Sequence, residues 1–198
     1  PGTGIRVEPG SYIALQVHYN TFNNDPKPDL TSVVFKTDDS VEHEALVQPW
    51  TKIQWVMGQG MKIPAGEEHV EHVWGADPFA LPIDLFGGAT GLRLYSASLH
   101  MHNLGKGGTT YIERADGTTE CLLNIDDYDF VWQRSYGFKE PTELRKGDKL
   151  SIRCEWDNSA ANQPYLDGKK IEPRDQHWGE GTTDEMCVGF FYIVPFSD

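Results

Sequence analysis

The sequence lacks several features that would place it in a common class of protein. No apolar run approaches the roughly eighteen residues that a membrane-spanning helix needs, and Pro1-Gly2-Thr3-Gly4 does not resemble a signal peptide, as expected of a mature or excised chain. Basic residues are outnumbered, with 17 Lys and Arg against 30 Asp and Glu and a net charge of −13 at pH 7. Because nucleic acids and anionic membranes attract basic surfaces, we expect neither as a partner.

Long amphipathic helical patterns are also missing, whereas short strand-like segments recur along the chain. With 38% hydrophobic and 12% aromatic residues among 198, the sequence can bury one substantial core. Clusters of Pro, Gly, Asn and Asp separate the strand candidates, which are residues 11–19, 31–37, 53–57, 92–102, 109–114, 119–125, 133–138, 149–156 and 188–194. This set predicts an all-β fold, a two-sheet antiparallel β-sandwich of the jelly-roll type.

Two stretches between the strand candidates are rich in turn-forming residues. The segment Asn23-Asn24-Asp25-Pro26-Lys27-Pro28 is typical of a linker. We therefore interpret residues 1–27 as the remnant of a preceding domain, with its linker and the strand that carries His18, and residues 28–198 as the jelly-roll domain. Residues 157–181 are expected to form a long surface loop.

Two distant segments together offer a set of ligands that copper prefers. His100 and His102 follow a predicted strand, and side chains two residues apart on a strand lie on the same face. Met186 adds a thioether, a soft neutral ligand that suits Cu(I) and that zinc, magnesium and calcium seldom recruit. We therefore predict copper bound by His100, His102 and Met186. In the alternative interpretation, the histidines form a polar strand face and Met186 fills the core.

The remaining histidines give weaker signals. The spacing of His69 and His72 would suit a metal only on a helix, so we predict a solvated charged segment there. His43 lies between two glutamates and is predicted at the surface. His177 is a candidate for a hydrogen bond to a ligand or substrate.

Three ordered motifs resemble the copper type II, ascorbate-dependent monooxygenases, the family of peptidylglycine α-hydroxylating monooxygenase and dopamine β-hydroxylase. The second and third resemble the C-terminal domain of that family. The motifs are Leu15-Gln16-Val17-His18-Tyr19-Asn20, His100-Met101-His102-Asn103-Leu104-Gly105-Lys106 and His177-Trp178-Gly179-Glu180-Gly181-Thr182-Thr183-Asp184-Glu185-Met186-Cys187. The resemblance also implies a jelly roll.

The resemblance implies a role for four residues. His100, His102 and Met186 match the ligands of the family's oxygen-activating copper, where dioxygen binds and a substrate C–H bond is hydroxylated. His18 matches one ligand of a second, electron-transferring copper. The other two ligands of that copper form an adjacent His-His pair in the family's N-terminal domain, and these 198 residues contain no such pair.

By this resemblance the chain is one half of an oxidoreductase that acts on a small organic substrate. Ascorbate would supply the electrons, and an N-terminal domain with the second copper site would be the partner. The isolated chain is then expected to lack full activity. The alternative is a non-catalytic, copper-binding β-sandwich.

The resemblance further implies a disulfide between Cys154 and Cys187. A disulfide requires an oxidising compartment, so a secreted or periplasmic location is expected. Cys121 would then be free, and we predict that it is packed. The alternative is three reduced, buried thiols in a cytosolic protein.

Three positions depart from the peptide-amidating members of the family. Those members hold the peptide with an arginine two positions before the His-x-His pair and with an asparagine and a tyrosine just after the Met-Cys pair. Here the residues are Ser98, Val188 and Phe190. Each departure removes a polar contact, so we expect a less polar or altogether different substrate.

Overall fold

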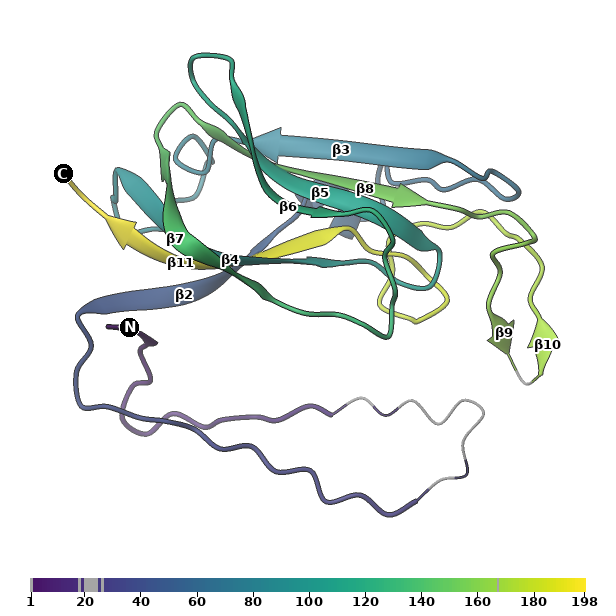
Figure 1. The fold of residues 1–198 in the computed structure, drawn as a ribbon, viewed down its shortest axis with the longest axis horizontal. Coiled ribbons are helices and arrows are strands. Elements are labelled where there is room, and N and C mark those ends of the chain that lie inside the picture. Colours follow the sequence, from purple (N-terminus) through teal and green to yellow (C-terminus); the bar gives the residue numbers. More distant parts are fainter. Residues whose placement is uncertain (1, 18, 20–24, 26, 167) are drawn as a thin grey trace.

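Two sheets lie face to face, and an extended N-terminal segment runs along one side of them (Figure 1). The computed structural model describes residues 2–17, 19, 25, 27–166 and 168–198. The elements in chain order are β1 (Thr3–Ile5), β2 (His43–Trp50), α1 (Ile53–Val56), β3 (Val70–Ala76), β4 (Gly91–His100), β5 (Gly105–Glu113), β6 (Thr119–Ile125), β7 (Tyr136–Arg145), β8 (Lys149–Trp156), β9 (Tyr165–Leu166), β10 (Lys169–Lys170) and β11 (Val188–Phe196).

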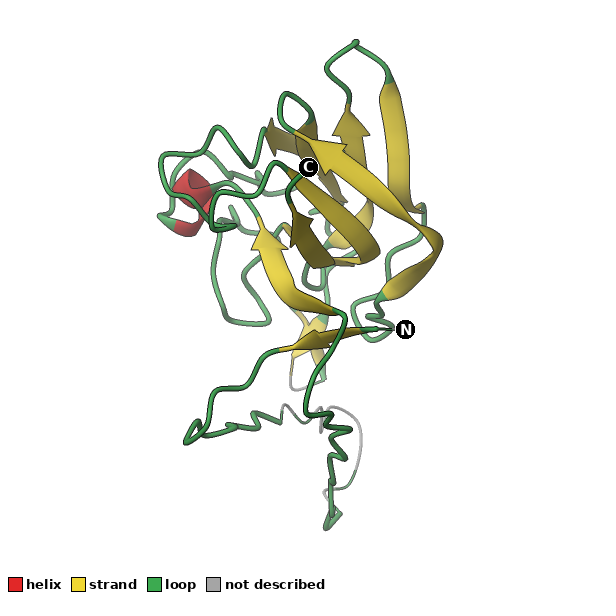
Figure 2. Ribbon diagram, turned by 90° about the vertical axis from the view of Figure 1, so that its left-hand side faces the viewer, coloured by secondary structure: helices red, strands yellow, loops and turns green. Residues whose placement is uncertain are grey.

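The strand order confirms the predicted all-β sandwich. One sheet has the order β1-β2-β11-β4-β7 and the other β3-β8-β5-β6, and among the described strands of these two sheets only the short β1–β2 pair is parallel. Most connections cross from one sheet to the other, an arrangement that fits the jelly roll implied by the resemblance. Figure 2 shows the two layers of strands and the short helix α1. No described helix has the length and hydropathy needed to cross a membrane.

The core between the sheets determines which way the residues of β4 face. Leu94 is buried, but the next buried side chains of the strand are Ala97 and Leu99, so the alternation shifts by one position. The shift coincides with a register irregularity between Leu94 and Ser96 where β4 pairs with β7. Because Leu99 now points into the core, His100 points to the outer face of its sheet.

A disulfide between Cys154 and Cys187 joins the two sheets and confirms the pair implied by the resemblance. Cys154 lies in β8 and Cys187 directly precedes β11, with both side chains fully buried and their Cα atoms 5.9 Å apart. Cys121 is free but exposed, so the prediction that it is packed is wrong. It lies on β6, at the edge of its sheet, where half of the side chains face solvent.

Replacing Cys154 and Cys187 together by Ala is expected to lower the free energy of unfolding by about 3–4 kcal/mol. The cross-link spans 33 residues, and its removal frees conformations of the unfolded chain. Chemical denaturation measures the change, and Cys121→Ala, the matched control at the exposed cysteine, should stay within about 0.5 kcal/mol of the parent. Equal losses in the two variants would contradict the assignment.

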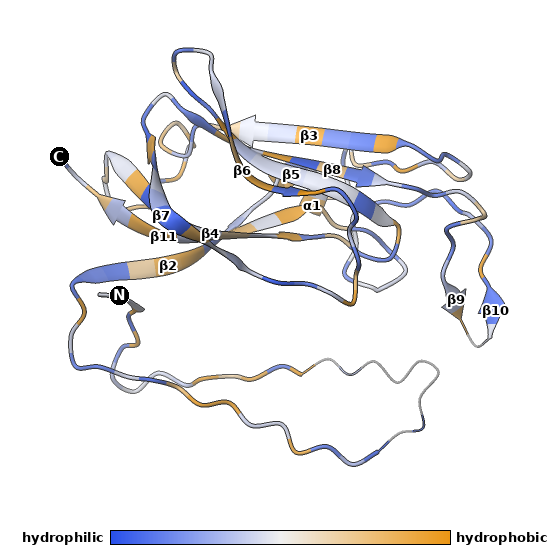
Figure 3. Cartoon of the chain, in the orientation of Figure 1, coloured by the Kyte–Doolittle hydropathy of each residue, from blue (hydrophilic) through white to orange (hydrophobic). Residues whose placement is uncertain are grey.

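The N-terminal arm, meaning the described residues between Arg6 and Val41, stands apart from the sandwich. Apolar segments alternate with polar ones along it (Figure 3). Its exposed large apolar side chains are Val7, Tyr12, Ile13, Leu15, Val17, Tyr19, Leu30, Val33, Val34, Phe35 and Val41. The strands predicted for residues 11–19 and 31–37 are absent from the described part of the arm. An isolated pair of strands is marginally stable in water unless a further sheet or helix covers it.

Two further local predictions are wrong. Residues 53–57 were predicted as a strand, but only Trp55 is buried and residues 53–56 form the short helix α1. The charged segment around His72 belongs partly to β3, where the imidazole packs against Trp55 and Trp156 with ring centroids 6.0 and 5.6 Å away. Its Nε2 lies 2.9 Å from the Lys62 carbonyl oxygen, so His72 is a packed rather than a solvated residue.

The predicted loop at residues 157–181 is more ordered than expected. It contains the small β9–β10 hairpin, and Asn158 anchors its start. The fully buried Asn158 amide donates to the carbonyl oxygens of Ile63, Pro64 and Arg174. These contacts tie both ends of the loop to the segment before β3, and the loop leads from there to Met186.

Candidate metal centre

His100 and His102 come together where β4 ends. His100 is the last residue of the strand, and His102 follows in the turn before β5. The two ring centroids lie 5.1 Å apart, with the planes nearly perpendicular. His100 is half-buried and His102 is buried, so one ring borders solvent and the other is enclosed. The strand predicted to reach residue 102 is shorter, yet the two imidazoles are adjacent.

Each histidine has one ring nitrogen engaged by an oxygen acceptor. The Nδ1 atom of His100 lies 2.5 Å from Oε1 of Gln133, and Nδ1 of His102 lies 3.0 Å from the carbonyl oxygen of Asp184. The Gln133 amide nitrogen donates to the Phe130 carbonyl oxygen at 2.7 Å, which orients Oε1 toward His100. Since both Nδ1 atoms then donate, Nε2 carries the lone pair on both rings. This tautomer leaves Nε2 of each ring free to bind a metal.

Burial keeps the His102 ring neutral. Desolvation lowers the pKa of His102 below its usual value near 6.5, and the Asp184 carbonyl opposes this effect. The nearby His100 also disfavours a second positive charge on His102. A neutral imidazole keeps its lone pair at neutral pH and is ready to bind a metal.

Met186 runs alongside the histidine segment. Val188 pairs with His100 in the β11–β4 ladder, and Glu185 accepts from the backbone N–H of His102 at 2.9 Å, so the Met186 backbone lies between these two contacts. Glu185 and Cys187 are buried while Met186 is half-buried. Alternation along an extended chain therefore directs the thioether away from the core, toward the outer face that also carries His100.

Glu185 is the functional residue that sequence reasoning missed. Its side chain is 1% exposed and accepts from the N–H groups of His102 (2.9 Å), Leu104 (2.7 Å) and the Trp156 indole (2.9 Å). Burial raises the pKa of Glu185 to about 7, although the N–H donors act in the opposite direction. One carboxyl group thus holds the turn containing His102 beside the segment that contains Met186.

The loop between β6 and β7, residues 126–135, supports the site from the other side. The Tyr128 hydroxyl accepts from the Met101 N–H and donates to the Met101 carbonyl, which fixes the residue between the histidines. Burial raises the pKa of Tyr128 to about 12, so it stays a donor. The Phe130 ring packs edge-on against His102, 5.6 Å between centroids, and the same loop supplies Gln133.

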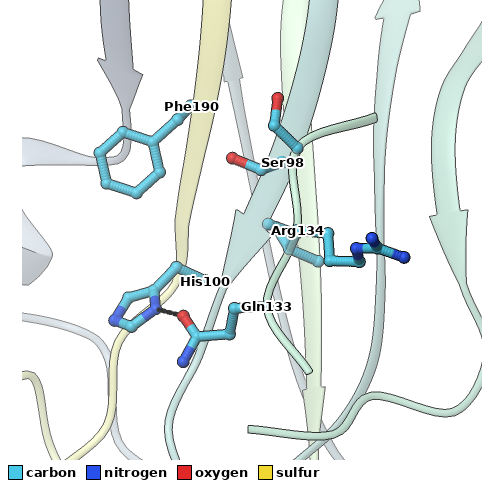
Figure 4. Close-up of a pocket in the computed structure, with 7 residues that line it drawn as sticks. Ser98, His100, Gln133, Arg134 and Phe190 are labelled. Atoms are coloured by element: carbon cyan, nitrogen blue, oxygen red, sulfur yellow. Dashed lines mark hydrogen bonds between the residues drawn. The ribbon is translucent and has the colours of Figure 1, made fainter. Parts of the chain in front are cut away.

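A pocket of about 190 Å³ opens beside His100 on the outer face of the sheet (Figure 4). Two of the three positions that depart from the peptide-amidating pattern lie in its wall, because Ser98 pairs with Phe190 across β4 and β11. We call it the His100 pocket. Its lining residues are Ser98, Leu99, His100, Gln133, Arg134, Ser135 and Phe190.

Among the described residues, no other histidine joins His100 and His102 in a cluster. His18 lies outside the described residues. His177 is exposed, and its carbonyl oxygen accepts from the Glu185 N–H at 3.2 Å. His43 is half-buried in β2 and His69 is exposed. Within residues 2–17, 19, 25, 27–166 and 168–198, no three His, Cys, Asp or Glu side chains cluster as a metal site.

Comparison with known proteins identifies the family. The family described as "Copper type II ascorbate-dependent monooxygenase, C-terminal domain" matches residues 52–197. DBH-like monooxygenase protein 1 of Mus musculus is 25% identical over 203 residues, covering 97% of this chain and 29% of that protein. The Homo sapiens protein of the same name is 24% identical over 200 residues, with the same shares. Dopamine beta-hydroxylase of Canis lupus familiaris is 27% identical over 106 residues, covering 53% of this chain and 15% of that protein.

These matches have two consequences. The chain spans less than a third of the length of the relatives it matches. The family match covers most of the sandwich, including both segments of the candidate centre, and it agrees with the family predicted from the three motifs. The chain therefore belongs to the copper type II, ascorbate-dependent monooxygenases and corresponds to their C-terminal domain.

Proposed function

We propose that this chain is the oxygen-activating copper domain of a monooxygenase that hydroxylates a C–H bond of a small organic substrate. One observation carries the proposal: two adjacent imidazoles, each with Nδ1 engaged by an oxygen, present Nε2 beside the Met186 segment. Two imidazoles and a thioether favour copper over zinc, magnesium or calcium. Bound copper would supply one-electron chemistry with dioxygen as co-substrate and ascorbate as the source of electrons.

The residues of the chain would orient this centre and admit the substrate. Gln133 and the Asp184 carbonyl fix the two rings, while Glu185 holds the turn of His102 beside Met186. The His100 pocket lies on the side of His100 that faces the solvent, so a substrate bound there would place a carbon close to the metal. Phe190 gives this pocket an aromatic wall.

An N-terminal domain with a second copper site would complete the enzyme. The N-terminal arm exposes apolar side chains on both of its runs, and burying them against another domain would remove this surface from water. His18 would be a ligand of that second copper, and residues 1–27 would belong to the preceding domain. The disulfide between Cys154 and Cys187 favours an oxidising compartment, secreted or periplasmic.

Anaerobic copper titration followed by Cu K-edge absorption tests the ligand set. We expect one copper per chain with a copper–sulfur signal in the reduced protein, and Met186→Ala should remove that signal. Met57, which is 67% exposed at the end of α1, offers the matched control, and Met57→Ala should leave the signal unchanged. Copper that binds without sulfur in the parent would overturn the His100, His102 and Met186 site.

A further inference from the structure

Arg134 differs from every other arginine of the chain. Six of the seven arginines form an ion pair with Asp or Glu: Arg6, Arg93, Arg114, Arg145, Arg153 and Arg174. Arg134 forms none within the described residues, although 30 acidic residues are present in the sequence. It also lines the His100 pocket. An unpaired guanidinium beside a candidate active site is available to a ligand.

The cation–π contact of Arg134 leaves its N–H donors free. The guanidinium carbon lies 5.0 Å from the centroid of the Trp132 ring, a cation–π contact. Stacking engages the face of a guanidinium, whereas its five N–H donors point outward in the plane. The contact with Trp132 therefore leaves the fork of N–H groups of the exposed Arg134 open to an oxyanion.

The pocket walls favour a ligand with an anionic end and an apolar body. None of the seven lining residues is acidic, so a cationic amine would meet Arg134 without a counter-charge. Ser98 and Ser135 supply hydroxyls, and Phe190 supplies an apolar ring 36% exposed. In Figure 4 the Arg134 guanidinium points away from the side chains of His100, Gln133 and Phe190.

We propose that Arg134 recognises an anionic group of the substrate, a carboxylate or a similar oxyanion, while an apolar part of the same molecule lies against Phe190 near His100. This inference rests on the proposed function and names the substrate class of that site. The pocket, at about 190 Å³, is smaller than the roughly 300–1,000 Å³ typical of sites for drug-sized ligands, which points to a small molecule. The anionic end would sit away from the carbon that is oxidised.

Three probes with one carbon skeleton test the charge preference: 3-phenylpropanoate, its neutral amide 3-phenylpropanamide, and the cation 3-phenylpropylamine. Their dissociation constants for the copper-free 198-residue chain can be measured by NMR titration. We expect the carboxylate to bind about three- to tenfold more tightly than the amide, as for a partly exposed charge-assisted contact, and the amine to bind most weakly. The shifted resonances should include those of Phe190 and His100.

Replacing Arg134 or Arg6 by Gln removes one positive charge in each case, so comparing the two variants locates the effect. Arg134→Gln should abolish the preference for the carboxylate, and Arg134→Lys should retain part of it. Arg6→Gln, far from the pocket, is the matched control and should leave the preference intact. No preference in the parent, tighter binding of the amine, or a preference that survives Arg134→Gln would each overturn the inference.

The copper experiment and the charge experiment fail independently. A copper–sulfur signal without a carboxylate preference would leave the copper site standing and remove the anionic substrate class. A carboxylate preference that depends on Arg134 in a chain that binds no copper would support the anion pocket and remove the monooxygenase function.

Discussion

Replacing Glu185 by Ala is expected to cost about 3–5 kcal/mol of folding free energy and to weaken copper binding by about 10–100-fold. The stability loss follows because three buried N–H donors, on His102, Leu104 and Trp156, lose their acceptor. The loss of affinity follows because the turn of His102 would no longer be held beside Met186, and groups that orient a metal ligand typically contribute this much. Urea denaturation and competition with a copper chelator measure the two effects.

Two further variants separate support of the fold from support of the metal site. Glu155→Ala, on the partly exposed face of β8, is the matched control and should change the unfolding free energy by less than about 1 kcal/mol. Glu185→Gln keeps the shape of the side chain but replaces one acceptor oxygen by an NH₂ group that faces N–H donors. Its unfolding free energy and its copper affinity should therefore lie between those of the parent and of Glu185→Ala. Unchanged copper affinity in Glu185→Ala, despite lower stability, would show that Glu185 supports the fold alone.

The candidate ligands were predictable because they form short, chemically distinctive motifs. His100 and His102 are two residues apart, and Met186 lies in a motif that ends at Cys187. The disulfide that brings Cys187 to the second sheet followed from the resemblance. Long strands with clear alternation, such as β6 and β8, were predicted with their observed bounds.

The supporting residues were not predictable because their roles depend on contacts distant in sequence. Glu185 is one of 30 acidic residues, and only its burial against Trp156 and the turn after β4 distinguishes it. Gln133 carries no motif and reaches His100 from a loop 33 residues away. The shift of apolar positions from Leu94 to Ala97 and Leu99 is present in the sequence of β4, but only the irregular pairing with β7 identifies it as a change of register that turns His100 outward.

Errors in predicted strands have a similar origin. The charged β3 is stabilised by seven pairs with β8, which outweigh its weak alternation. The apolar runs at residues 11–19 and 31–37 resemble strands in composition, but the described part of the arm has no sheet to join. A periodic pattern predicts a strand only where a partner is available to complete its hydrogen bonds.

The 198-residue chain by itself is expected to show little or no coupled hydroxylation. Inserting one oxygen atom of dioxygen into a C–H bond and releasing the other as water consumes two electrons from the donor. A chain with one copper site stores one electron, and these residues contain no adjacent His-His pair to complete a site with His18. Anaerobic reduction followed by oxidative titration should therefore return one electron per chain, and two from a longer protein that includes the preceding domain.

The electron count also separates the enzyme from the non-catalytic alternative without knowledge of the substrate. Two electrons per longer protein, with hydroxylation that Met186→Ala abolishes, is the result expected of the monooxygenase. Sustained hydroxylation by the 198 residues alone would contradict the requirement for a second site. A longer protein that still returns one electron would favour the non-catalytic sandwich. The preceding domain would then cover the exposed apolar side chains of the N-terminal arm without delivering a second electron.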